Sequence, residues 1–150
     1  MKRAFTMIEL IFVIVIIGIL AAVAIPKMAA TRMDAKVATT ANIVTSAANE
    51  IASYAVSQGV ISNNIPAMSK IAQGLIAKQG ASFDSSNGIL KIKMHTVSDC
   101  IKLAITHDNN DMNLTMSYGN AGSDEACTAL QQVVDAANYP IPLKGNTVRF

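Results

Sequence analysis

The sequence predicts an α+β protein with a long N-terminal helix, membrane-embedded in its first half, packed on a small antiparallel sheet, and with a C-terminal region closed by a disulfide. Three observations support this fold class. An apolar run at residues 5–25 is followed by helical periodicity to about Ser57. The apolar period then changes to the alternation typical of strands from Leu90 onward. Two cysteines, Cys100 and Cys127, lie in this second part.

The apolar run from Phe5 to Ile25 is long enough to cross a bilayer once. At a helical rise of about 1.5 Å per residue, it covers roughly the 30 Å of the hydrocarbon core. It contains a single charge, Glu9, and a carboxylate is so costly in lipid that it indicates a functional residue. The alternative is a secretory signal cleaved after Ala24, but Glu9 and the length of the run count against a removable signal.

Residues 4–10, which read Ala-Phe-Thr-Met-Ile-Glu-Leu, resemble the N-terminus of type IV pilins and type II secretion pseudopilins. The resemblance implies that a prepilin peptidase cuts between Ala4 and Phe5 and methylates the new amino group of Phe5. The family usually has glycine before the cut, so Ala4 is a departure that keeps the residue small. Glu9 falls where the family keeps a glutamate. The apolar run to Pro26 also fits the family, whereas the remainder of the chain carries no motif of it.

The cut would create an ammonium group at Phe5, four residues before Glu9. In a filament, we expect the Glu9 carboxylate of one subunit to accept the Phe5 ammonium of a neighbour, which neutralises both charges in one axial register. The alternative places Glu9 at the headgroup boundary without a docking partner. Gly18 and Pro26 match helix-loosening positions of the family and weaken a helix in any case; a plain kink at the membrane exit is the alternative.

Beyond Pro26 the helical pattern continues, with a narrow apolar stripe that can lie on a globular domain. Its members are Val37, Ala41, Val44, Ala48, Ile51 and Ala55. A free coiled coil is the alternative, but the small side chains would make it weak. Residues 60–88 are expected to connect this helix to the sheet through one short helix, opened by Asn63, Asn64 and Pro66 and closed at Gly80.

Three strands are expected to follow as an antiparallel meander with one face on the long helix. The inward side chains would be Leu90, Ile92, Met94, Ile101, Leu103, Ile105, Met112, Leu114 and Met116. A last helix is expected with Ser123 as its N-cap, ending before Tyr139. Lys91, Lys93 and Lys102 could form a basic outer stripe, which most often serves solvation, so nucleic-acid binding is not expected.

Cys100 and Cys127 lie beyond the membrane segment, in what would be an oxidising compartment. An even count there favours a disulfide, and two free thiols are the alternative. By the chain-entropy model the crosslink contributes about 3 to 4 kcal/mol. Many type IV pilins close their C-terminal region in this way, so the resemblance supports the pairing.

Other candidates for chemistry are weak. Asp108 and Asp111 flank two asparagines and could bind calcium, as a loop of major pseudopilins does, but Asp and Asn are ordinary hairpin-turn residues. His95 and His107 share no zinc-ligand spacing with the cysteines. The sequence has no phosphate-binding glycine loop, nucleophile elbow or paired acid and base. We therefore expect a non-enzyme that needs no cofactor.

The expected organisation is a cleaved leader at residues 1–4, a transmembrane and filament-core helix at 5–26, and the rest of the long helix with a head domain at 27–150. The formal net charge of the 150-residue chain is +2. Loss of Lys2 and Arg3 with the leader would leave 12 − 2 = 10 basic residues against 10 acidic ones. A strongly charged surface for an acidic or basic partner is therefore not implied.

The resemblance implies a structural subunit of a type IV pilus-like filament. Its partners would be copies of itself, with or without minor pilins, the prepilin peptidase and an inner-membrane assembly platform. The subunit would wait in the bacterial inner membrane as a single-pass protein with its head outside the cytoplasm, then join an extracellular or periplasmic filament. The alternatives are a type II secretion pseudopilin for protein export and a Sec-exported soluble binding protein cleaved after Ala24.

Overall fold

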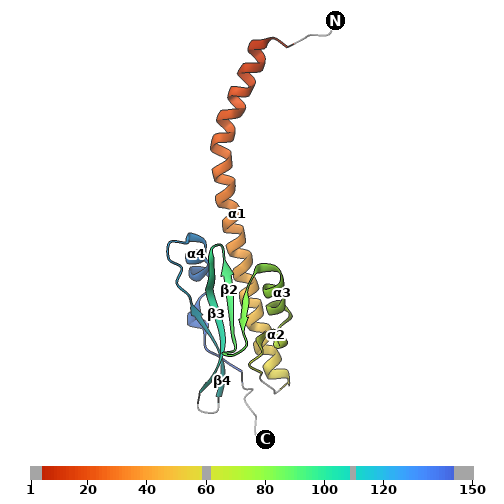
Figure 1. Cartoon of the computed structure of the whole chain (residues 1–150), viewed down its shortest axis with the longest axis vertical. Helices are drawn as coiled ribbons and strands as arrows, with labels where there is room; N and C mark the ends of the chain where they lie inside the picture. The colour runs from red at the N-terminus through yellow and green to blue at the C-terminus, as the bar shows by residue number, and fades with distance from the viewer. Residues whose placement is uncertain (1–4, 59–61, 109–110, 144–150) are drawn as a thin grey trace. The chain divides into compact units, whose positions relative to one another are not determined.

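The computed structural model describes residues 5–58, 62–108 and 111–143. The chain divides into two compact units, residues 1–36 and 37–150. The described part of the first unit consists of the start of one long helix, and the second unit contains the rest of that helix together with all the other elements (Figure 1).

The long helix, α1, spans Met7–Gln58 and passes without interruption through Pro26. It begins two residues after the start of the apolar run because Thr6, which is not helical, caps it. Its last residue agrees with the predicted end near Ser57. Gly59, a residue type that commonly follows the end of a helix, lies outside the described residues.

The second half of α1 supplies one wall of the core. All six predicted stripe residues are buried, together with Thr40 and Ala47. Ala47, Ala48 and Ile51 are completely inaccessible, and the small alanines allow the sheet to approach the helix closely. The predicted long helix packed on a sheet is thus confirmed.

Two short helices, not one, connect α1 to the sheet: α2 at Ile65–Met68 and α3 at Lys70–Gln79. The break occurs at Ser69, whose backbone is extended, with φ −141° and ψ 122°. Ser69 Oγ accepts a hydrogen bond from Ala72 N at 3.0 Å and donates one to Glu50 Oε2 at 2.6 Å. Gly80 ends α3 in the left-handed conformation, with φ 70°, as predicted.

Glu50 connects α1 to the start of α3. Its Oε2 atom accepts the Ser69 hydroxyl and also the Ile71 N–H, at 3.1 Å. These two hydrogen bonds, the one from Ser69 first, hold the pKa of Glu50 below its usual value. One carboxylate on α1 therefore satisfies backbone and side-chain donors at the N-terminus of a second helix.

The described residues form one five-stranded antiparallel sheet in the order β1-β2-β3-β4-β5. The three predicted strands are its centre, and the two edge strands were not predicted because they are too short to show an alternating pattern. The bounds are β1 Ser82–Asp84, β2 Ile89–Met94, β3 Val97–Asp108, β4 Asp111–Tyr118 and β5 Ile141–Pro142.

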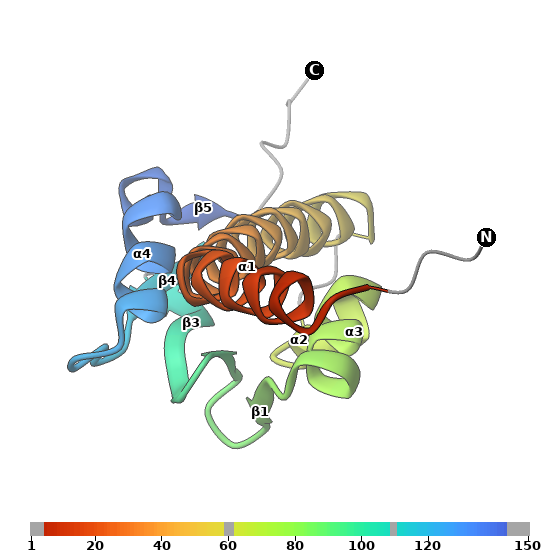
Figure 2. The same cartoon turned by 90° about the horizontal axis from the view of Figure 1, so that it is seen from above.

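One face of this sheet completes the core. Eight of the nine predicted inward side chains are buried, and Met112, near the start of β4, is half-buried. The register places inward residues side by side, with Leu90 opposite Leu103 and Leu103 opposite Met116. In both views α3 and α4 lie on opposite sides of the second half of α1 (Figures 1 and 2).

The C-terminal helix α4 spans Glu125–Val133 and is followed by a short 3₁₀ helix, η1, at Ala136–Asn138. Its N-cap is Asp124 and not the predicted Ser123, because Asp124 Oδ1 accepts the Cys127 N–H at 3.0 Å. At the other end, the Tyr118 hydroxyl donates to Val134 O at 2.6 Å and accepts from Ala136 N at 2.9 Å. Strand β4 therefore holds the end of α4.

Candidate functional site

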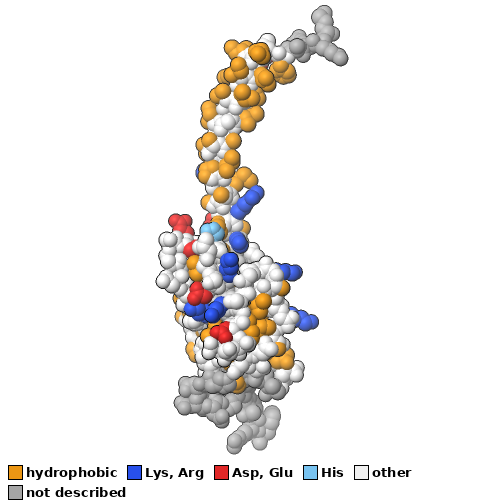
Figure 3. All heavy atoms as spheres, viewed as in Figure 1, with side chains coloured by type: hydrophobic (Ala, Val, Ile, Leu, Met, Phe, Trp, Pro, Cys, Tyr) orange, Lys and Arg blue, Asp and Glu red, His pale blue; other side chains and the backbone are white. Residues whose placement is uncertain are grey.

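The N-terminal half of α1 exposes its apolar side chains instead of burying them. An 18-residue window has a mean hydropathy of 3.1 and none of it is buried; in Figure 3 hydrophobic side chains cover the visible side of this segment. Among the described residues, α1 is the one helix long and apolar enough to cross a membrane. Such a surface is unfavourable in water and needs lipid or other apolar helices around it.

Glu9 and Thr6 form a capping box at the start of α1. Glu9 Oε2 accepts hydrogen bonds from the Thr6 backbone N–H and from the Thr6 hydroxyl, both at 2.8 Å, and Thr6 Oγ1 accepts the Glu9 N–H at 3.4 Å. The carboxylate also lies near the positive end of the helix dipole. The unassembled chain thus provides Glu9 with local partners.

Thr6 was missed by the sequence analysis, although its signal was present. A threonine followed three residues later by a glutamate, just before an apolar run, is the sequence pattern of a capping box. The second carboxylate oxygen, Oε1, has no hydrogen-bond donor among the residues that the structure describes, so it is open to a further donor.

Of the two residues at the expected cleavage site, Phe5 is described by the structure and Ala4 is not. Phe5 precedes the helix and its side chain is 84% exposed. Phe5 is therefore accessible, but in this unprocessed chain it is not on the helical face that carries Glu9.

Gly18 and Pro26 lie within the continuous helix. A Cβ added at Gly18 would meet nothing within 4 Å, so contacts within the chain do not require a glycine there. Pro26 has no N–H and leaves the carbonyl four residues earlier, at Ala22, without its helical donor. Local weakening of α1 at these positions stays a prediction.

The disulfide between Cys100 and Cys127 is confirmed. It joins β3 to α4 with a Cα–Cα distance of 5.7 Å, and both cysteines are fully buried. Gln131, which the sequence analysis did not identify, donates from Nε2 to Cys100 O at 2.9 Å and to Gly119 O at 3.0 Å. The crosslink and the amide together fix α4 against β3 and against the residue that follows β4.

Asp124 fastens the β2–β3 turn to the N-terminus of α4. Its Oδ2 atom accepts hydrogen bonds from the Thr96 hydroxyl and from Thr96 N at 3.1 Å, and lies 2.9 Å from His95 Nδ1. These contacts, with that from Cys127 N, hold the pKa of Asp124 well below its usual range, the Thr96 hydroxyl contributing most. His95 adopts a left-handed backbone, with φ 49°.

The weaker candidates gain no support. Asp108 and Asp111 are paired at the ends of β3 and β4, but their side chains lie outside what the structure describes. Within the described part of the chain, no group of three or more His, Cys, Asp or Glu side chains could hold a metal ion. In the predicted basic stripe, Lys102 Nζ lies 2.9 Å from Asp99 Oδ2, so its charge is partly neutralised.

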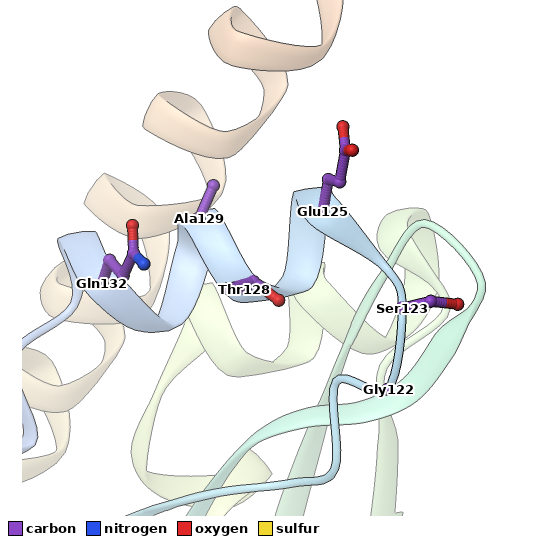
Figure 4. Close-up of a pocket in the computed structure, with 6 residues that line it drawn as sticks. All are labelled: Gly122, Ser123, Glu125, Thr128, Ala129 and Gln132. Atoms are coloured by element: carbon purple, nitrogen blue, oxygen red, sulfur yellow. The ribbon is translucent and has the colours of Figure 1, made fainter.

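A shallow hollow of about 330 Å³ lies along α4 (Figure 4). Six residues line it, and most are polar: Gly122, Ser123, Glu125, Thr128, Ala129 and Gln132. Its lining includes neither a cysteine nor a histidine, and one acid without a base partner does not form a catalytic pair.

These features define a class of protein: a chain with one N-terminal apolar span, a carboxylate near its start, and a disulfide-closed α+β head. Residues 1–25 match the family described as the prokaryotic N-terminal methylation motif. This motif is the prepilin signal of type IV pilins and pseudopilins, so the resemblance noted in residues 4–10 is confirmed, and such a motif is typical of structural proteins. Neither the curated proteins nor the solved structures contain a significant match to this chain.

Proposed function

We propose that this protein is the structural subunit of a type IV pilus-like filament, assembled through its N-terminal helix. The match of residues 1–25 to the methylation motif carries this proposal. The exposed apolar half of α1 supports it, because the same surface suits lipid before assembly and neighbouring helices afterwards. The buried disulfide suits a head domain that faces an oxidising compartment.

In this function the prepilin peptidase removes residues 1–4 by cutting between Ala4 and Phe5, and the amino group of Phe5 is methylated. The cut replaces a neutral peptide N–H with an ammonium group at the start of the membrane segment. It also removes Lys2 and Arg3, the two cations of the leader. Before the apolar run, the mature subunit therefore has a single cation, the new ammonium group of Phe5, close in sequence to the Glu9 carboxylate.

Docking then uses the oxygen of Glu9 that the capping box leaves open. Oε2 keeps its hydrogen bonds to Thr6, and Oε1 accepts the Phe5 ammonium of a neighbouring subunit. The ammonium and the carboxylate neutralise each other only in one axial register, so the pair mainly determines how neighbouring subunits align. Gly18 and Pro26 allow α1 to stretch as it leaves lipid for the helical bundle.

A pseudopilus that exports proteins uses the same N-terminal chemistry, and the methylation motif is common to both assemblies. It is therefore the second candidate. The two differ in their partners: a retraction motor encoded beside this chain favours a pilus, and secretion-specific components favour a pseudopilus.

The experiment that tests the proposal is mass spectrometry of the N-terminal peptide of the mature protein from its native host. A methylated Phe5 start is expected. A start at Ile25 would mean removal of a secretory signal, and an intact Met1 would mean a simple membrane anchor; either result overturns the proposal. The variant Ala4→Leu is a matched control. It should block the cut, because the family has a small residue before the cleaved bond and leucine is large.

A further inference from the structure

Three cations follow the apolar half of α1 within ten residues. We call Lys27, Arg32 and Lys36 the exit cluster. All three side chains are exposed, and among the described residues none of them forms an ion pair. Asp34 is the one acid in residues 27–36, so this segment has a net charge of 3 − 1 = +2. Figure 3 shows Lys and Arg side chains where the apolar surface of the helix ends.

The axial spacing places this cluster at the level of lipid headgroups. Lys27 is 20 residues beyond Met7, or about 30 Å along the helix, which equals the thickness of the hydrocarbon core. Arg32 and Lys36 lie about 8 and 14 Å further on. Headgroups occupy roughly 5–8 Å on each side of the hydrocarbon, and long cationic side chains reach back along the helix toward them.

The angular spacing separates a lipid partner from a protein partner. At 3.6 residues per turn, Arg32 lies about 140° around the helix from Lys27, and Lys36 lies about 180° from it. A protein docked on one face would meet a stripe of residues three or four apart. Arg32 and Lys36 are four residues apart and share one face, but Lys27 lies on the opposite side. One docked protein face therefore cannot meet all three cations, whereas headgroups surround the helix.

We propose that the exit cluster binds the phosphate groups of anionic phospholipids in the leaflet at the C-terminal end of the membrane span, and thereby sets the depth of α1 in the membrane. The proposal rests on the membrane-spanning state of the proposed function and does not need the filament. Near an anionic surface each Lys or Arg strengthens membrane association by about five-fold. During assembly these contacts are exchanged for others as the subunit leaves the bilayer.

The test compares lipid selectivity around the full chain reconstituted in bilayers of phosphatidylglycerol and phosphatidylcholine. Spin-labelled lipids report the association of each headgroup with the helix. We expect a several-fold preference for phosphatidylglycerol that falls to about one in Lys27→Gln/Arg32→Gln/Lys36→Gln and decreases with added salt. The matched control, Lys70→Gln/Lys78→Gln/Lys93→Gln, removes the same charge from exposed positions of the head and should keep the preference.

Two results would overturn the inference: no preference in the unaltered chain, or the same preference in the exit-cluster variant. A third result would assign the cations to a second copy of the chain. In that case the unaltered chain shows no lipid preference, and the exit-cluster variant no longer self-associates in bilayers of pure phosphatidylcholine. Carbonate extraction separates failure of this inference from failure of the function. A chain released by carbonate lacks the membrane span and defeats both, whereas a retained chain without selectivity defeats the lipid site alone.

Discussion

At the scale of single residues, Glu9 caps its own helix, and the docking role that we propose for it uses a different atom. The capping box occupies Oε2 within one chain, and Oε1 is open for a donor from outside. A carboxylate in lipid is expensive, and the local hydrogen bonds from Thr6 reduce that cost before any neighbour arrives. In the proposed function, these local hydrogen bonds allow the subunit to stay in the membrane and still carry a charge for docking.

Substitutions at Glu9 should separate these roles. We expect Glu9→Ala to be cleaved normally but to lower the filament yield at least ten-fold, because truncating one partner of a buried charge pair costs about 2–5 kcal/mol. Glu9→Lys should assemble less than Glu9→Gln, since it sets ammonium against ammonium. Yields of sheared filaments, normalised to processed subunit in the membrane, measure this. Equal yields from the Lys and Gln variants would contradict electrostatic docking.

We expect Asp124 to make the stability of the head domain sensitive to acid. Hydrogen bonds from Thr96 and Cys127 hold its pKa below the usual range. Because the pKa is lowered in the folded state, the stabilisation is complete above the unfolded pKa of about 3.9 and is lost as the pH falls below it. Urea unfolding of the full chain in detergent, followed from pH 7 to pH 3, should show this loss.

The Asp124→Asn variant should unfold at lower urea at pH 7 and lose less stability on acidification than the unaltered chain. Asp135→Asn is the matched control, because Asp135 caps only the short helix η1. If Asp124→Asn loses as much stability between pH 7 and pH 3 as the unaltered chain, other carboxylates determine the acid response.

At the scale of elements, the sequence predicted the helix and strands that carry a repeating apolar pattern. It did not predict the very short strands or the contacts between residues far apart in the sequence. The stripe of α1 and the inward faces of β2, β3 and β4 were predicted because each pattern extends over several residues. Strands of two or three residues cannot show alternation, so β1 and β5 were missed. The helix break at Ser69 depends partly on the hydrogen bond to Glu50, 19 residues away. Asp124 holds the β2–β3 turn partly through His95, 29 residues away. Such pairings carry no sequence pattern.

A pair of glycines tests the packing of these elements. A Cβ at Gly119, between β4 and α4, would lie 1.8 Å from Asp99 O, whereas one at Gly74, inside α3, would meet nothing within 4 Å. We expect Gly119→Ala to lower the free energy of unfolding by about 1–3 kcal/mol through overpacking. Gly74→Ala should raise it by about 0.5–1 kcal/mol. Urea unfolding of the two variants checks both signs; stabilisation by Gly119→Ala would show that β3 and β4 can separate there.

At the scale of the whole molecule, the two units are stabilised by different surroundings. No described residue of the first unit is buried, so its apolar surface needs apolar surroundings such as lipid or other helices. The second unit contains all the buried apolar residues of the described chain, including the disulfide. A change in the head should therefore alter folding of the head without altering recognition of the N-terminal segment by the peptidase.

The disulfide tests this separation. Cys100→Ala/Cys127→Ala should lower the free energy of unfolding of the head by about 2–5 kcal/mol, because the crosslink restricts the unfolded chain and closes a loop across β3 and α4. Cleavage before Phe5 should continue at the normal rate, since the motif lies in residues 1–25. Denaturation of the full chain in detergent measures the first effect, and the mass of the N-terminal peptide measures the second. Uncleaved double variant in the membrane would show that the peptidase requires a folded head, and the two units would then be coupled during maturation.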